Sequence, residues 1–315
     1  MDTAPKIKSL DIPENKRIIC ISDIHGELDL FKRLLDKVEF ADDDMLILLG
    51  DTYSKGSQCA ECLSFMMEFS KALNIHILRG NSDWGRWGYE TPAQVEWLET
   101  LPHIIESQDY VFVHAGLSSM DLSGQTIAGC VKTDAFMENI PENASPFDKW
   151  VIAGHWPVAM YCHQISCNNP IVNEKKRIIA IDGGNVLKPD GQLNAFIIEQ
   201  DRFSFTHLDN LPLMTASKAQ KASGGTLNVT WLDRFVDIIE ENGEFSCVRH
   251  IKTGQILSVP NSRIWTDKEG NVCTCDSATD YYLPLNIGDK FSVAETFSDR
   301  IYGKKDGICG WVLLR

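Results

Sequence analysis

The sequence predicts an α/β fold followed by a small all-β region, and three observations support this prediction. Short apolar runs alternate with amphipathic stretches from Arg17 to Leu78. Strand-like segments then dominate between His103 and Leu208. After Pro212 the composition changes again, and short strands with glycine-containing turns replace the helical pattern.

The N-terminal part has the alternation typical of a mostly parallel sheet. Apolar residues recur at helical intervals over 28–38 and again over 63–73. Each stretch follows a short apolar run, so this part is expected to form a right-handed strand–helix–strand–helix–strand unit. Later strands are expected at His103–Glu106, Tyr110–His114, Val151–Ala153, Ile178–Ile181, Leu193–Glu199 and Phe203–Leu208.

The C-terminal part is expected to be a separate region. Residues 213–226 are predicted to form a linker, because most of this stretch is rich in Ala, Ser, Lys and Gly. A hairpin is expected about Asn242-Gly243 within residues 227–315. Gly288–Val293 and Gly307–Val312 resemble segments of bacterial SH3-like β-barrels, as one module or two. Exposed aromatic residues of such a barrel would bind a peptide, although Tyr281, Tyr282 and Trp311 fit core packing equally well.

Composition limits the partners. The net charge is −14 and the pI is near 5.0, which argues against nucleic acid or an anionic membrane as a partner. No signal peptide and no apolar run of membrane length is apparent. Ten scattered cysteines are expected to be reduced. We therefore expect a cytoplasmic protein.

Side chains of metal-ligand type follow the ends of five predicted strands. They are Asp23, His25, Asp51, Asn81, His114 and His155. Loops that leave the C-terminal ends of strands line the crevice of an open α/β sheet, where ligands bind. Three imidazoles, two carboxylates and one amide oxygen would form a cage for two divalent metal ions.

The ordered motifs resemble those of the calcineurin-like metallophosphoesterases, and among them the phosphoprotein phosphatase type. The family pattern reads G-D-x-H-G, G-D-x-x-D-R-G, G-N-H-E, H-A/G-G and G-H. The matching segments here are Ser22–Gly26, Gly50–Gly56, Gly80–Asp83, Val113–Gly116 and Gly154–Pro157. The resemblance covers roughly the first two thirds of the chain. It implies a four-layer sandwich of two mixed β-sheets flanked by helices.

The resemblance also implies a role for each ligand-type residue. Asp23 and His25 would bind the first metal, and Asp51 would bridge both metals. Asn81, His114 and His155 would complete the second site. Manganese is the expected metal, and the same ligand set admits iron or zinc. Two such cations about 3.5–4 Å apart activate a bridging hydroxide for attack on phosphorus.

Departures from the family pattern affect the chemistry. Ser82 replaces the family's general-acid His, and Ser54 replaces the Asp that orients it. Lys55 replaces an Arg, so a two-pronged phosphate contact becomes a point charge. The candidate catalytic residues are therefore Ser82, Lys55 and, as a substitute acid, Asp83 or His163. Lys55, Asn81 and Arg86 are the candidate substrate-binding residues, and Arg86 or Arg79 would replace the lost guanidinium.

Loss of the acid favours substrates with good leaving groups. A serine alkoxide gains about 10²–10⁴-fold from protonation, whereas a tyrosine phenolate, with a pKa of about 10, needs less help. The leading hypothesis is a metal-dependent phosphatase of phosphoproteins, including phosphotyrosine, or of small phosphate esters. The alternative is a nucleotide hydrolase resembling symmetrical diadenosine tetraphosphatase. A third is a scaffold that binds metals or phosphopeptide without turnover.

Overall fold

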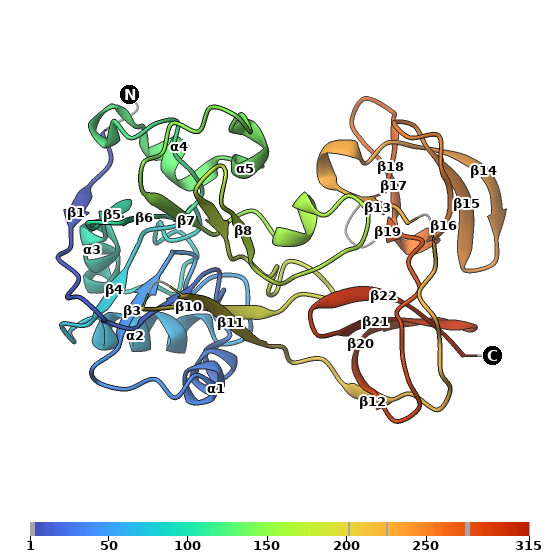
Figure 1. Ribbon diagram of the computed structural model, residues 1–315, viewed down its shortest axis with the longest axis horizontal. Coiled ribbons are helices and arrows are strands. Elements are labelled where there is room, and N and C mark those ends of the chain that lie inside the picture. The colour runs from blue at the N-terminus through green and yellow to red at the C-terminus, as the bar shows by residue number, and fades with distance from the viewer. Residues whose placement is uncertain (1–3, 201, 225, 275–277, 315) are drawn as a thin grey trace. The chain divides into compact units, whose positions relative to one another are not determined.

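The computed structural model describes residues 4–200, 202–224, 226–274 and 278–314 (Figure 1). The chain divides into two compact units. Unit 1 comprises Met1–Val158, Asn169–Val186 and Gln192–Asp209, and unit 2 comprises Ala159–Asn168, Leu187–Gly191 and Asn210–Arg315. This division differs from the expected one at 1–212, 213–226 and 227–315, because two internal segments belong to unit 2.

Unit 1 contains two mixed β-sheets, as the sequence predicts. The first has the order β11 (Arg202–Leu208), β10 (Leu193–Glu199), β2 (Ile18–Ile21), β3 (Met45–Leu48) and β4 (Ile75–Ile77). Strands β2, β3 and β4 are parallel, and β10 is antiparallel to both β2 and β11. The second has the order β1 (Ile7–Ser9), β5 (Ile104–Glu106), β6 (Tyr110–Val113), β7 (Trp150–Ala153), β9 (Ile178–Ala180) and β8 (Ile171–Asn173).

Alternation along the strands builds two cores. On β2, Ile19 and Ile21 pack with the helices, whereas Ile18 and Cys20 pack with residues of the second sheet. This two-residue period is expected of a strand buried on both faces. Helices α1 (Leu28–Lys37), α2 (Cys59–Phe69) and α3 (Pro92–Thr100) flank the first sheet, and the short α4 (Ile127–Lys132) and α5 (Phe136–Asn139) follow β6 (Figure 1).

The helices differ from the prediction at two places. The predicted second stripe reaches Leu73, but α2 ends at Phe69 and Leu73 is 96% exposed. The chain turns there because the Ser70 hydroxyl and the Lys71 amide donate back to the last carbonyls of the helix. Helix α3 was missed, although Thr91 and Gln94 form a capping box at its start.

The described residues of unit 2 are all-β apart from single 3₁₀ turns. Its larger sheet has the order β12 (Leu213–Thr215), β20 (Lys290–Thr296), β21 (Arg300–Lys305) and β22 (Ile308–Leu313). A second sheet contains β14 (Val236–Asn242), β15 (Phe245–His250) and β16 (Ile256–Pro260). The remaining strands form two ribbons, β13 (Asn228–Val229) with β19 (Ala278–Thr279), and β17 (Ile264–Thr266) with β18 (Val272–Thr274).

Three sequence predictions in unit 2 can be compared with the structure directly. The hairpin at Asn242-Gly243 is confirmed, because β14 pairs with β15 and Gly243 has a positive φ. Strand β12 begins at the first residue of the expected linker and pairs with β20. Tyr281 and Trp311 are buried rather than grouped on the surface, so these two rings fill the core instead of forming a peptide groove. The SH3-like resemblance stays a prediction.

The two internal segments of unit 2 are fixed by hydrogen bonds to C-terminal residues. The Asn168 amide donates to the Gly307 carbonyl at 2.8 Å, and the Cys309 amide donates to the Ser166 carbonyl at 2.9 Å. In the other segment the buried Lys304 ammonium donates to the carbonyl of Asp190 at 2.9 Å. These contacts explain why both segments group with the C-terminal strands.

Among the described helices, none combines enough length with enough apolar character to cross a lipid bilayer.

Candidate metal centre

Each candidate ligand lies in the segment that leaves the C-terminal end of a strand of unit 1. Because β2, β3 and β4 are parallel, Asp23, Asp51 and Asn81 leave the first sheet at the same edge. Strands β6 and β7 are also parallel, and they carry His114 and His155 at their ends. The predicted convergence at strand ends is therefore what the topology produces.

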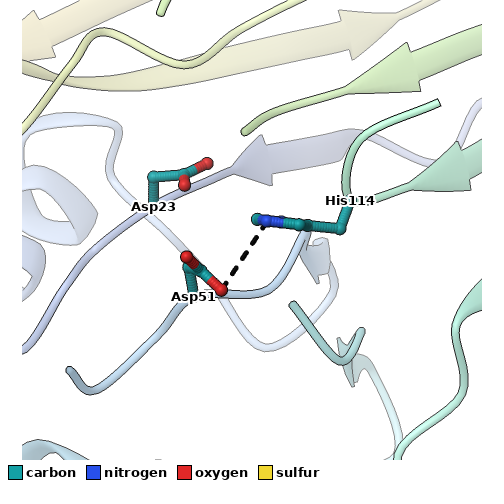
Figure 2. Close-up of side chains that lie close together, drawn as sticks. All are labelled: Asp23, Asp51 and His114. Carbon is teal, nitrogen blue, oxygen red and sulfur yellow. Dashed lines mark ion pairs between the residues drawn. The ribbon is translucent and has the colours of Figure 1, made fainter. Parts of the chain in front are cut away.

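Asp23, Asp51 and His114 form the tightest group (Figure 2). Each offers a ligand atom within 4.8 Å of the other two, and all three residues are buried. Nε2 of His114 lies 3.6 Å from Oδ1 of Asp51. Nδ1 of His114 donates to the Leu49 carbonyl at 2.7 Å, so Nε2 is the ring nitrogen that faces the Asp51 carboxylate.

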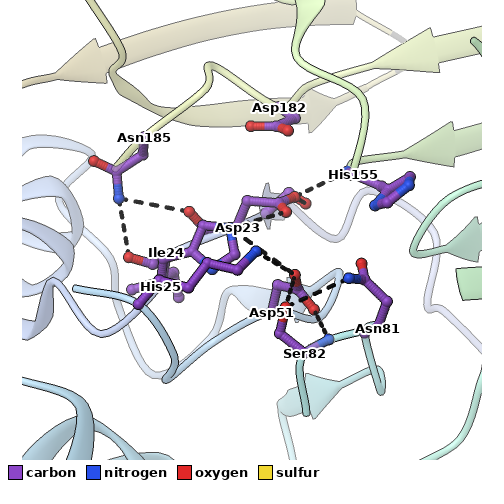
Figure 3. Close-up of polar contacts among 12 residues, drawn as sticks. Asp23, Ile24, His25, Asp51, Asn81, Ser82, His155, Asp182 and Asn185 are labelled. Atoms are coloured by element: carbon purple, nitrogen blue, oxygen red, sulfur yellow. Dashed lines mark hydrogen bonds and ion pairs between the residues drawn. The ribbon is translucent and has the colours of Figure 1, made fainter. Parts of the chain in front are cut away.

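The other three candidate ligands adjoin this group (Figure 3). Nε2 of His25 lies 3.6 Å from Oδ1 of Asp23 and 3.9 Å from Oδ2 of Asp51. Oδ1 of Asn81 lies 2.9 Å from Nε2 of His114. The His155 ring centroid is 5.1 Å from that of His114. All six side chains are thus brought together around one small region.

These residues fit a metal centre on a further ground. The His25 side chain is fully buried, and neither of its ring nitrogens has a hydrogen-bond partner. Buried imidazoles are normally hydrogen-bonded, so an orphaned one beside two carboxylates is suited to hold a cation. The mixed nitrogen and oxygen donors match manganese, iron or zinc.

The electrostatics of the group favour positive charge. Burial lowers the pKa of His114, but the carboxylates of Asp51 and Asp23 outweigh it, so the pKa is raised. Burial raises the pKa of Asp51, but His114, His25 and the Ser82 amide outweigh it, so this pKa is lowered. A field that favours a proton on His114 also favours a metal ion in the same place.

The backbone at the site is strained. Asp23, His25, Asp51, Lys55 and His155 all have positive φ, between 50° and 77°. Left-handed backbone costs a residue with a Cβ about 1–2 kcal/mol. Such outliers persist where the surrounding structure enforces them and are frequent at functional sites. The strain turns these side chains inward from the strand ends.

Two glycines allow the backbone to approach the carboxylates. A Cβ at Gly80 would stand 2.1 Å from Oδ1 of Asp51, and one at Gly154 would stand 2.7 Å from Oδ2 of Asp23. Neither distance is compatible with a real side chain. The glycines of the motifs are therefore required by close packing against the two acidic ligands.

Comparison with known families agrees with this geometry. A model of the calcineurin-like phosphoesterase family matches residues 16–185, which is more than half of the chain. The protein is a calcineurin-like phosphoesterase. The match spans all six candidate ligands.

Curated relatives of this phosphoesterase are named bis(5′-nucleosyl)-tetraphosphatase, symmetrical. The protein from Pasteurella multocida is 27% identical over 119 residues, which cover 31% of this chain and 43% of the relative. That from Mannheimia succiniciproducens is 25% identical over 167 residues, which cover 46% and 54%. The chain thus spans about half the length of these relatives.

Solved structures also resemble this phosphoesterase. One, provisionally designated a diadenosine tetraphosphatase, is 19% identical with a TM-score of 0.49, covering 65% of this chain and 99% of that one. A cold-active protein-tyrosine phosphatase from a Shewanella species is 18% identical with a TM-score of 0.42, covering 65% and 82%.

Ser82 is hydrogen-bonded to Asp51, so its position differs from that of an acid that would protonate a leaving group. Its amide donates to Oδ1 of Asp51 and its hydroxyl donates to Oδ2, both at 2.8 Å (Figure 3). Ser82 therefore holds the candidate bridging carboxylate in one orientation. Ser54 is fully buried, and its hydroxyl has no hydrogen-bond partner.

The Asp83 side chain is also hydrogen-bonded within the site. Its carboxylate accepts hydrogen bonds from the amides of Asp51 at 2.7 Å, Thr52 at 3.2 Å and Gly80 at 2.9 Å. Burial and the neighbouring Asp51 raise the pKa of this fully buried group. This geometry differs from that expected of a substitute acid. Both carboxylate oxygens accept hydrogen bonds from backbone amides, and these bonds connect two of the metal motifs.

The basic candidates differ in their surroundings. Nζ of Lys55 is 3.8 Å from Oδ2 of Asp51, and its side chain is 30% exposed, so it faces the metal centre from its rim. Arg86 is exposed, with its guanidinium 5.7 Å from the Trp84 ring centroid. Arg79 is buried against the same ring at 3.9 Å. His163 belongs to unit 2, where it pairs with Asp233.

Three supporting residues were not assigned a role from the sequence. The Asn185 amide donates to the Ile24 carbonyl at 2.9 Å and to the Asp23 carbonyl at 3.5 Å, which holds the strained turn of the first motif (Figure 3). Asp134 accepts from Nε2 of His155 at 3.2 Å. The Ser22 hydroxyl donates to Oδ2 of Asp23. Proximity in the fold identifies Asn185 and Asp134, whereas Ser22 is the first residue of the first metal motif and directly precedes Asp23.

Replacement of Asp51 by Asn should remove bound metal. The amide has one oxygen where the carboxylate has two, and it lacks the charge that attracts the cations. We expect metal analysis after dialysis to give less than one ion per chain, against two for the wild type. Asp36→Asn makes the same change on an exposed helix surface and should keep both ions. Two ions retained in Asp51→Asn would contradict the bridging role.

Gly80→Ala should weaken metal binding without unfolding the chain. The new Cβ would displace Oδ1 of Asp51, which it would approach to 2.1 Å. Metal affinity, measured by equilibrium dialysis with manganese, should fall about 10–100-fold, as for other changes that misplace a ligand. Gly224→Ala is the control, because its Cβ would have no neighbour within 4 Å. Equal affinities in the two variants would refute the packing argument.

Proposed function

We propose that this protein is a manganese-dependent phosphohydrolase that cleaves the phosphoanhydride chain of dinucleoside tetraphosphates. The observation that carries the proposal is the setting of Ser82, whose hydroxyl is used to hold Asp51. No protonating side chain takes the position of the family's general acid, and a phosphate leaving group needs little protonation. The names of the curated relatives point to the same substrate class.

This proposal reverses the order of the sequence-based hypotheses. A phosphoprotein substrate was the leading hypothesis, and a nucleotide hydrolase was the alternative. The relatives support the alternative better, since both are named for a dinucleoside tetraphosphate. Phosphotyrosine stays compatible with the missing acid and is therefore part of the test.

Each residue has a defined task in the proposed reaction. When bound, the two cations supply Lewis-acid polarisation of the phosphate and a nucleophile derived from water. Asp51 would supply a carboxylate oxygen to each metal site, and Ser82 fixes the orientation of Asp51. Lys55, on the rim, would neutralise a phosphate oxygen. The position of cleavage in the phosphate chain would depend on which phosphate group binds at the metal centre.

A substrate panel tests the proposal. With manganese added, diadenosine tetraphosphate should be cleaved to two molecules of ADP faster than a phosphotyrosine peptide is hydrolysed. A phosphoserine peptide should be slowest, because its alkoxide leaves without an acid. Asp51→Asn should be inactive on every substrate. Comparable rates for phosphoserine peptide and diadenosine tetraphosphate would contradict the leaving-group argument, and no turnover with both metals bound would favour the scaffold hypothesis.

Lys55 should contribute to phosphate binding. Lys55→Ala should lower kcat/KM for diadenosine tetraphosphate about 10–100-fold, the value of one charge-assisted hydrogen bond. Lys55→Arg should keep part of the rate, because the charge remains. Lys71→Ala, which removes an exposed lysine paired with Glu68, is the control and should behave as the wild type. A wild-type rate in Lys55→Ala would exclude the phosphate contact.

A further inference from the structure

Trp87 presents an exposed aromatic ring next to the metal centre. Its side chain is 46% exposed. Nε1 of the indole donates to the Ser82 carbonyl at 2.9 Å. Ser82 in turn donates to both oxygens of Asp51. A single residue therefore links the indole to the candidate bridging ligand.

The loop that carries Trp87 is fixed in place. The amides of Trp87 and Gly88 donate to the Glu90 carboxylate at 3.0 and 2.8 Å. Glu90 also accepts from the Tyr53 hydroxyl at 3.2 Å, and that hydroxyl accepts from the Gly85 amide at 3.0 Å. Tyr53 lies two residues after Asp51 in the second metal motif. The ring is thus held in advance of ligand binding, which reduces the entropy that a ligand must overcome.

Trp84, in the same loop, differs from Trp87. The Arg79 guanidinium lies 3.9 Å from the Trp84 ring centroid, and that of Arg86 lies 5.7 Å from it. Trp84 is therefore already packed against cations. Among the residues that the structure describes, no ring or guanidinium stacks on Trp87. Its side chain is 46% exposed, and its only polar group is satisfied by Ser82.

We propose that Trp87 is the stacking platform for one nucleobase of the substrate. This inference rests on the proposed function and adds the residue that recognises the nucleoside. A dinucleoside tetraphosphate carries its bases at the two ends of the phosphate chain, so phosphates at the metals place a base outside them. An indole whose N–H is already bonded offers only its π face, which suits stacking rather than hydrogen-bonded base readout. Purine and pyrimidine nucleotides should both be accepted.

Kinetics of Trp87→Ala and Trp87→Phe test the platform. Substrates are diadenosine tetraphosphate and inorganic tripolyphosphate, which has the same kind of anhydride bond without a base. In Trp87→Ala the KM for the dinucleotide should rise about tenfold, and the KM for tripolyphosphate should not change. Trp87→Phe loses the N–H but keeps an aromatic ring. Because the ring is what stacks, the KM of this variant for the dinucleotide should stay close to that of the wild type. Trp231→Ala removes an exposed tryptophan of unit 2 and is the control.

Product inhibition supplies a second readout. With p-nitrophenyl phosphate as the reporter substrate, Trp87→Ala should raise the inhibition constant of ADP about tenfold and leave that of pyrophosphate unchanged. Metal content should equal that of the wild type. A uniform loss on both substrates, or lost metal, would assign Trp87 a purely structural role and overturn the inference.

Failure of the inference and failure of the proposed function are distinguishable. If the wild type cleaves diadenosine tetraphosphate and Trp87→Ala has the same KM, the platform is refuted and the function stands. If the wild type leaves the dinucleotide intact and hydrolyses phosphotyrosine peptide, the function is refuted. In that case the ratio of the ADP and pyrophosphate inhibition constants still decides whether Trp87 binds a base.

Discussion

The structure of the site depends on how the Asp51 carboxylate is held. Two hydrogen bonds from Ser82 fix its oxygens, and the backbone amide of Asp51 is fixed in turn by Asp83. Gly80 lets the neighbouring loop approach, since any side chain there would collide with Oδ1. Moving this one carboxylate would disturb the environments of His114, His25 and Lys55 together.

This arrangement gives Ser82 a role other than that of a general acid. In the family pattern the residue after Asn81 is a His, whereas here it is a Ser directed at Asp51 rather than at a leaving group. The Ser82 hydroxyl therefore orients the Asp51 carboxylate. That role agrees with the proposed substrate class, whose leaving group is already stable as an anion.

Much of unit 1 follows from local sequence patterns. Short apolar runs predicted most strands of both sheets, although not β1 and β8. Ligand-type residues after strand ends predicted the candidate metal centre, because parallel strands bring their ends to one edge. Some features that the sequence did not reveal depend on contacts between residues far apart in the chain. Asn185 is 161 residues from Ile24 and is linked to it only by the fold. Leu73 fits a helical period, yet local turn hydrogen bonds end the helix before it. Asp83 resembles a catalytic acid until its three amide partners are known.

The two internal segments of unit 2 affect how this chain could have been assembled. They follow His155 and Asn185 closely in sequence, and their backbones bond to C-terminal strands and loops. A gene fusion that moved only residues 213–315 to another phosphoesterase would leave Gly307, Cys309 and Lys304 without these hydrogen-bond partners. Exchange of this region between enzymes would therefore keep these three hydrogen bonds only if both internal segments were transferred with the C-terminal strands.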